Sequence, residues 1–151
     1  MDLPWSAEEL LPHSRSMVLI DDVIDGGEDW ALAGVRIGED SPFFDPVLGG
    51  VPSWVGIEYM AQTVALFSGI QAKRAAKDIK IGFLLGTRRY KAEADHFPLG
   101  TYLKIRVSKG WDDGQMAVFD CELGSDQPLA AGRLNVYQPE DPQVLISGEH
   151  A

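Results

Sequence analysis

The fold is decided by one stretch of sequence, Val51-Pro52-Ser53-Trp54-Val55-Gly56-Ile57-Glu58-Tyr59-Met60-Ala61-Gln62-Thr63-Val64-Ala65-Leu66-Phe67. It predicts a helix with Pro52 in its first turn that runs through Gly69 to a charged end near Lys77. Between Trp54 and Phe67, the only strongly polar side chains are those of Glu58, Gln62 and Thr63. A helix that is apolar on every side is normally surrounded by the rest of its protein. We therefore expect this helix at the centre of the fold, with Trp54 in the core.

Glu58 is the first candidate for chemistry. A carboxylate inside an apolar helix is costly unless it is paired, hydrogen-bonded or neutral. The alternative is a buried glutamate satisfied by the backbone or by an arginine, for which Arg89 and Arg133 are candidates. Gln62 lies one turn further along the same helix face, where it either positions Glu58 or fills a polar gap.

Strand-like segments lie on both sides of the helix. Runs rich in β-branched and alternating apolar residues predict strands at Met17–Ile24, Trp30–Ile37, Ile79–Ala94, Thr101–Ser108, Gln115–Leu123 and Leu129–Tyr137. The intervening signals predict a short helix at Ser6–Pro12, a loop at Glu39–Gly50, a turn at Asp95–Gly100 and a hairpin turn at Asp112-Asp113-Gly114. One helix against one curved antiparallel sheet is an α+β arrangement. We predict that residues 1–151 form one domain, with a loose tail at 139–151.

Composition excludes several classes of function. With 13 basic and 23 acidic residues, the net charge is −10, which argues against nucleic acid as a partner. No apolar run is long enough to span a membrane, and no residues have metal-ligand spacing. The single cysteine, Cys121, is predicted to be a small core residue, and a reducing cytoplasm fits best. We expect no cofactor and no metal.

Basic residues gather in one window despite the negative net charge. They include Arg74, Lys77, Arg88 and Arg89. One interpretation is a solvated helix end that is favoured by the helix dipole. The other is a docking surface for an acidic partner or a phosphate-bearing ligand.

Three motifs follow one another along the chain: Leu11-Pro12-His13-Ser14-Arg15-Ser16-Met17-Val18-Leu19-Ile20-Asp21, then Ile57-Glu58-Tyr59-Met60-Ala61-Gln62, then Gly132-Arg133-Leu134-Asn135-Val136-Tyr137-Gln138-Pro139. With Pro52-Ser53-Trp54, they resemble the hotdog-fold 3-hydroxyacyl-ACP dehydratases, most closely the divergent subfamily of aryl-polyene and fatty-acid-like gene clusters. The resemblance implies a hotdog fold, in which a curved antiparallel sheet of about five to six strands wraps one long central helix.

One departure from the family matters for catalysis. The family carries a catalytic histidine in a G-H-F-P loop before the helix, but this chain reads Ser41-Pro42-Phe43-Phe44-Asp45-Pro46, with Ser41 near the histidine position. Asp95-His96-Phe97-Pro98 is similar to the motif but follows the helix, so we predict that His96, like His150 in the tail, is solvent-exposed. His13, a structural residue in typical members, is the remaining candidate for the base.

The resemblance implies a substrate carried as a thioester on acyl carrier protein. Glu58 is then the acid of a 3-hydroxyacyl-ACP dehydratase, and Gly50, Ser53, Trp54 and Gln62 are the predicted substrate-binding residues. The missing histidine leaves two alternatives open, an acyl thioesterase and a non-catalytic subunit that pairs with an active dehydratase. The basic window becomes a docking surface for the acidic carrier protein, and we expect a homodimer or a heterodimer with a related hotdog chain.

Overall fold

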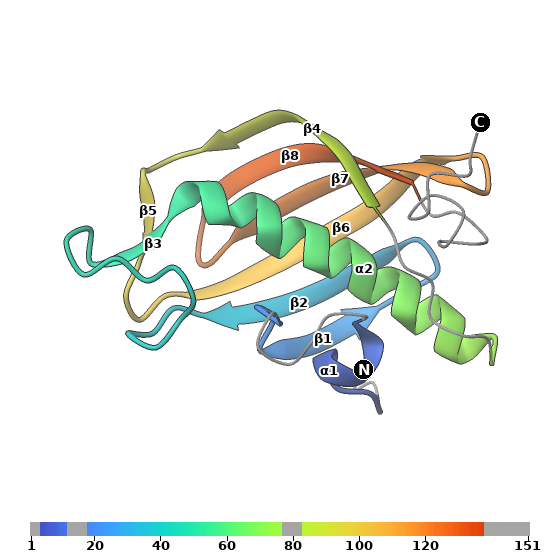
Figure 1. The fold of residues 1–151 in the computed structure, drawn as a ribbon, viewed down its shortest axis with the longest axis horizontal. Helices are drawn as coiled ribbons and strands as arrows, with labels where there is room; N and C mark the ends of the chain where they lie inside the picture. The colour runs from blue at the N-terminus through green and yellow to red at the C-terminus, as the bar shows by residue number, and fades with distance from the viewer. Residues whose placement is uncertain (1–3, 12–17, 77–82, 138–151) are drawn as a thin grey trace, which may run out of the picture.

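A computed structural model describes residues 4–11, 18–76 and 83–137, which form one long helix and two antiparallel sheets (Figure 1). The helices are α1 (Ala7–Leu10), α2 (Gly56–Arg74) and a 3₁₀ helix (Ser53–Val55) that leads into α2. The strands of the six-stranded sheet are, in spatial order, β1 (Asp22–Gly26), β2 (Trp30–Arg36), β6 (Tyr102–Asp112), β7 (Met116–Gly124), β8 (Pro128–Tyr137) and β4 (Phe83–Ala92). The second sheet pairs β3 (Gly50–Pro52) with β5 (His96–Pro98). The predicted helix on a curved antiparallel sheet is confirmed.

The core lies between α2 and the inner face of the six-stranded sheet, across which the helix runs (Figure 1). Alternate residues of β6 point inward, and Leu103, Ile105 and Val107 are completely buried. On the helix side, Phe67 packs edge-on against Phe119 of β7, with ring centroids 5.6 Å apart. Burial of these large apolar side chains is the main stabilising contribution to the fold.

One side of α2 is less buried than the prediction required. We call this side the open stripe. Its residues recur every three or four positions, and they are Trp54, Glu58, Ala61, Ala65 and Ser68. Trp54 is 54% exposed, so the prediction that it lies in the core is wrong, and the single chain leaves this side of α2 partly uncovered. The physical reason for this difference is that the sequence shows which helix faces are apolar. It does not show whether an apolar face is covered by the same chain.

Element boundaries follow the predictions with several differences, among them β6, which continues to Asp112 beyond the predicted end at Ser108. The helix begins at Gly56, after a 3₁₀ turn, and ends at Arg74, while Lys77 lies outside the described residues. The first strand begins only at Asp22. The predicted turn at Asp95–Gly100 is wrong in part, because it contains β5, whose backbone pairs with β3.

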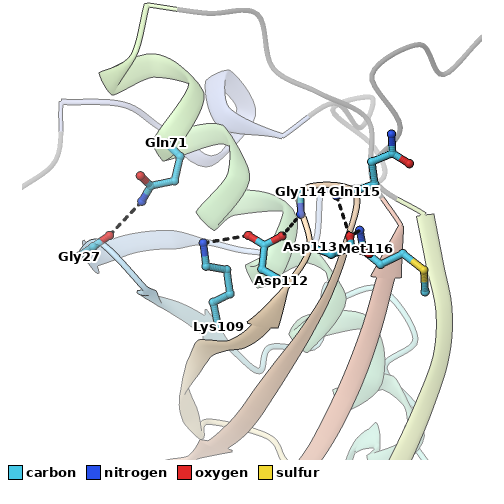
Figure 2. A network of polar contacts seen from close by, with 8 residues as sticks. All are labelled: Gly27, Gln71, Lys109, Asp112, Asp113, Gly114, Gln115 and Met116. Carbon is cyan, nitrogen blue, oxygen red and sulfur yellow. Dashed lines mark hydrogen bonds and ion pairs between the residues drawn. The ribbon is translucent and has the colours of Figure 1, made fainter.

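The far end of α2 is fastened to the β1–β2 turn, and the β6–β7 turn is held by hydrogen bonds of its own (Figure 2). Gln71 Nε2 donates to the carbonyl oxygen of Gly27 at 3.0 Å, which ties the helix to the β1–β2 turn. In the β6–β7 turn, Asp112 accepts from the Gly114 amide at 2.7 Å and lies 3.2 Å from Lys109 Nζ. Asp113 accepts from two further backbone amides of the same turn, and these hydrogen bonds hold the pKa of both carboxyl groups below its usual range. The predicted hairpin turn is confirmed.

Small residues allow close packing at the start of the chain. The Ser6 hydroxyl caps α1 by accepting from the Glu9 amide, and the Glu9 carboxylate accepts in return from the Ser6 amide. A Cβ atom on Gly69 would lie 2.3 Å from the carbonyl oxygen of Leu10, so glycine is what lets α1 approach α2.

Cys121 lies on the inner face of β7. It is buried, as predicted, and burial raises the pKa of its thiol to about 12, with a smaller contribution from Asp120.

Candidate functional site

Glu58 lies in the first turn of α2, in the middle of the open stripe. Its side chain is exposed, so the prediction of a carboxylate enclosed by apolar side chains is wrong for a single chain. It makes no hydrogen bond or ion pair with any residue in the described ranges 4–11, 18–76 and 83–137.

The surface around Glu58 is apolar. Trp54, one turn earlier, packs edge-on against Phe43 of the preceding loop, with ring centroids 5.3 Å apart. Phe43 is 51% exposed and Val47 is 94% exposed. A free carboxylate surrounded by exposed aromatic and aliphatic groups is unusual on a surface that faces only water, because clustered exposed apolar side chains mark a binding surface.

The arginines considered as partners of Glu58 lie elsewhere. Arg133 Nε donates to Asp120 Oδ1 at 2.9 Å, so pairing of Arg133 with Glu58 is wrong. Arg89 is exposed at a bulge of β4, where it adopts a φ of 56°. Neither arginine neutralises Glu58 among the described residues.

Ser41, near the expected position of the loop histidine, has a structural role. Its hydroxyl accepts from the Gly38 amide at 2.8 Å and donates to the Arg36 carbonyl oxygen at 3.3 Å. Ser41 lines a cavity of about 110 Å³ together with Tyr59, whose pKa is raised well above its usual range by burial and by the nearby Asp21. Nothing in this loop can accept a proton as an imidazole would.

The space beside two glycines near the start of α2 is occupied by other atoms of the protein and not left open for a ligand. A Cβ atom on Gly50 would lie 2.1 Å from the carbonyl oxygen of Phe97, and one on Gly56 would lie 2.2 Å from the Tyr90 hydroxyl. That hydroxyl donates to the carbonyl oxygen of Ser53, and burial raises the pKa of Tyr90 to about 12. Gly50 and Ser53 therefore hold the helix start in place, and a role for either in substrate binding stays a prediction.

Gln62 is buried, 4% exposed, although Glu58 one turn earlier is open to solvent. Its Oε1 accepts from the backbone amide of Leu19 at 2.8 Å, so the side chain fastens the segment before β1 to α2. This contact is structural, and a role for Gln62 in positioning Glu58 or in binding substrate stays a prediction.

The structure brings His96 back to the start of α2, a position that the sequence analysis missed. His96 lies on β5 directly opposite Pro52, and its Nδ1 is 2.6 Å from Asp95 Oδ1. Its side chain is 28% exposed, so the prediction of a solvent-exposed residue in a turn is wrong. One signal in the sequence is available, namely the similarity of Asp95-His96-Phe97-Pro98 to the family motif. The sequence analysis gives it no weight because the segment follows the helix in sequence.

The predicted docking residues come from two separate elements. Arg74 ends α2 and donates to the Gly26 carbonyl oxygen at 3.2 Å, while Arg88 and Arg89 lie in the middle of β4, away from that end of the helix (Figure 1). Lys77 lies outside the described residues. The structure therefore places three of the four predicted docking residues, and they lie on two separate elements.

The two remaining histidines, His13 and His150, lie outside the described residues. Within the part of the chain that the structure describes, no three His, Cys, Asp or Glu side chains are grouped as metal ligands. In the same part, no helix is long and apolar enough to cross a membrane.

Comparison with known proteins gives a consistent set of relatives. The family model "ApeP-like: ApeP dehydratase" matches residues 5–147. Among solved structures, the chain is similar to the dehydratase heterocomplex ApeI:P from Xenorhabdus doucetiae, with a TM-score of 0.89 and 30% identity over 97% of this chain and 99% of that one. This likeness confirms the predicted hotdog fold.

Two curated relatives are similar in sequence. The 3-hydroxyacyl-[acyl-carrier-protein] dehydratase FabZ of Roseobacter denitrificans is 31% identical, over 82% of this chain and 88% of that protein. The FabZ of Cereibacter sphaeroides is 27% identical, over 82% of this chain and 85% of that protein.

Proposed function

The chain belongs to the ApeP-like dehydratase family, and from this premise we propose that it removes water from a 3-hydroxyacyl thioester carried on acyl carrier protein, in polyene or fatty-acid-like biosynthesis. The observation that carries the proposal to this chain is Glu58, an exposed carboxyl group at the start of α2 that has no partner among the described residues and lies one turn from the exposed aromatic side chain of Trp54. An acyl chain matches the apolar surface, and the carboxyl group supplies the acid.

Glu58 acts on the β-hydroxyl group of the substrate. Dehydration removes a proton from the α-carbon and expels the β-hydroxyl, which must be protonated as it leaves. The same helix start presents backbone amides that can polarise the thioester carbonyl. In a single chain Glu58 faces water, but a second subunit over the open stripe would exclude that water and favour the neutral carboxyl that donates a proton.

The proposed partner is a second hotdog subunit, either a copy of this chain or a related dehydratase. Strand β4 is an edge of the six-stranded sheet, and it exposes Leu84 and Leu85 at 41% and 54%. An edge strand with exposed apolar residues has unpaired backbone groups that favour pairing with another strand. The similar structure from Xenorhabdus doucetiae is a dehydratase heterocomplex, which supports the heterodimer. The proposed compartment is the cytoplasm, in keeping with one unpaired cysteine.

Turnover of a 3-hydroxyacyl-ACP by the purified chain, alone and mixed with a related dehydratase, tests this function. We expect mass spectrometry to show an enoyl product lighter by one water. Release of the free acid would instead identify a thioesterase. An unchanged substrate, both with the chain alone and with the mixture, would overturn the proposal. Turnover by the mixture, but by neither protein alone, would place the active site between two different subunits.

Charge reversal on β4 tests the carrier-protein docking surface. We expect Arg88→Glu to weaken carrier-protein binding about 5-fold at low salt, with a smaller effect at high salt, because exposed charges interact weakly and are screened. Isothermal titration calorimetry measures the Kd. Lys104→Glu on β6, an equally exposed cation, is the matched control. Equal Kd values for the Arg88 variant and the control would exclude this part of β4 as the dock.

A further inference from the structure

A small cavity lies between α2, the end of β2 and the loop that follows β2. Its volume is about 110 Å³. The residues of its lining that have polar side chains are Asp21, Arg36, Asp40, Ser41 and Tyr59. None of them belongs to the open stripe or to the predicted docking surface, so the cavity is a separate feature of the molecule.

Tyr59 supplies the buried polar group of this cavity. Its side chain is only 2% exposed, yet its hydroxyl makes no hydrogen bond with any residue in the described ranges. Every fully buried side-chain nitrogen or oxygen in the same ranges does have a partner. The hydroxyl is therefore the part of Tyr59 that reaches the cavity. Because an unsatisfied buried hydroxyl costs free energy, a ligand that bonds to it recovers that loss.

The other polar groups with unused capacity at the cavity are acceptors. The Ser41 hydroxyl is already used, since it donates to the Arg36 carbonyl oxygen and accepts from the Gly38 amide. Asp21 uses Oδ2 to accept from the Arg36 amide at 2.7 Å, which leaves its Oδ1. Asp40 makes no hydrogen bond or ion pair with the part of the chain that the structure describes. A ligand that donates hydrogen bonds and carries positive charge therefore matches this cavity.

Arg36, the one cation of the lining, has its charged group elsewhere. Val35 is buried in the core, so the alternation of residues along β2 places the Arg36 side chain on the outer face of the sheet. Its guanidinium lies there over the Tyr102 ring, 4.9 Å from the centroid. The Tyr102 hydroxyl donates to Asp22 Oδ2 at 2.7 Å. The Arg36 guanidinium is therefore held away from the carboxylates of the cavity.

The chain around the cavity is strongly acidic. Residues 21–45, which include β1, β2 and the following loop, contain eight acidic residues and one basic residue, Arg36. The net charge of this stretch is −7, which is most of the net charge of −10 of the whole chain. A surface of this kind attracts cationic partners and repels acidic ones.

The size of the cavity indicates which cation it takes. Since a water molecule in the liquid occupies about 30 Å³, the cavity corresponds to roughly three to four water molecules. A guanidinium group, with one carbon and three nitrogens, has a comparable size and presents its N–H donors in one plane. The hydrogen bonds of Ser41 already hold the loop in place, so binding requires little further ordering.

We propose that this cavity is the docking site for an arginine side chain from the basic surface of a partner protein. The guanidinium donates to the hydroxyl oxygen of Tyr59 and to the carboxylates of Asp21 and Asp40. Arginine side chains commonly anchor protein interfaces in this way. The inference does not depend on the proposed dehydration, and an acidic carrier protein is not the partner.

A short peptide tests the site on the full chain. We expect Ac-Gly-Arg-Gly-amide to shift the backbone amide NMR signals of Leu19 and Ser41 in a saturable way. The matched peptide with citrulline in place of arginine has nearly the same shape but no charge, and it should leave these signals unchanged. Equal shifts with both peptides, or no shifts with either, would overturn the inference.

Two variants test whether the arginine occupies this cavity. Tyr59→Phe removes only the hydroxyl, so we expect the Kd for the arginine peptide to rise about 10-fold, because the lost hydrogen bond joins a charged group. Asp21→Asn keeps an acceptor for the Arg36 amide but removes the charge, and it should weaken binding by a similar factor. Tyr102→Phe, on the outer face of the sheet, is the matched control and should keep the wild-type Kd. Wild-type Kd values for both Tyr59→Phe and Asp21→Asn would contradict the proposal.

The melting temperature without peptide gives an independent check. Because the Tyr59 hydroxyl has no partner in the described part of the chain, Tyr59→Phe should melt at or above the wild-type temperature. A melting temperature several degrees lower would show that the hydroxyl is already bonded within the fold, and the site would then not be open to a ligand.

Two other occupants of the cavity would give different results. If calcium chloride shifted the same amide signals as the arginine peptide, the cavity would be a metal site. Arg15 of this chain lies outside the described residues, and peptide binding that appears only after Arg15→Ala would identify Arg15 as the occupant. Either result would overturn docking of a partner protein.

Discussion

Replacing Glu58 by glutamine is expected to lower the dehydration rate by roughly 10²- to 10⁴-fold, which is the usual contribution of a positioned acid. The amide keeps the shape of the side chain but has no acidic proton for the leaving hydroxyl. Because Glu58 is exposed and has no partner among the described residues, the fold should be unaffected. Enoyl product formation measures the rate, and the melting temperature monitors the fold.

Glu122→Gln is the matched control for this prediction. Glu122 is an exposed glutamate on β7 and belongs to no part of the proposed site. We expect its variant to match the wild-type rate. If Glu58→Gln also did so, Glu58 would have no part in the chemistry, and the acid would have to come from the partner subunit.

Replacing Gly50 by alanine is the second large effect that we expect. The new methyl group would lie 2.1 Å from the Phe97 carbonyl oxygen, so β3 and β5 would have to separate. Overpacking of this kind costs about 1–3 kcal/mol, which lowers the melting temperature of a chain this size by several degrees. Separation also disturbs the chain that leads into the start of α2, where Glu58 lies, so activity should fall well below wild type at temperatures where the variant is folded.

Gly110→Ala on β6 is the control for this second variant. A Cβ atom there would lie 3.4 Å from its nearest neighbour, the Val118 carbonyl oxygen, which is an ordinary contact. We expect its melting temperature and activity to stay near wild type. Full activity of folded Gly50→Ala would show that the β3–β5 pairing does not position the reacting groups.

The main architecture could be predicted because its signals are local. Alternation along β6 and the Asp112-Asp113-Gly114 turn each depend on residues close together in the chain, and the structure agrees with both. The pairing of β3 with β5 joins segments that are distant in sequence and only three residues long, so neither carries a strand pattern of its own. His96 was missed for that reason.

The error about Glu58 has a different origin. An apolar helix pattern indicates that a surface is covered, but a second chain can cover it as well as the first. Trp54 and Ala61 belong to such a surface, and only the three-dimensional arrangement shows that the single chain leaves it open. The resemblance predicts that Glu58 carries the reacting carboxyl group, and the structure describes its surroundings.

Burial of Cys121 has a consequence for the handling of thioesters. With a thiol pKa of about 12, roughly one molecule in 10⁵ carries the thiolate at pH 7. Acyl exchange and disulfide formation both require the thiolate. Because burial keeps the Cys121 thiol protonated, we expect no transfer of the proposed acyl group to this sulfur atom.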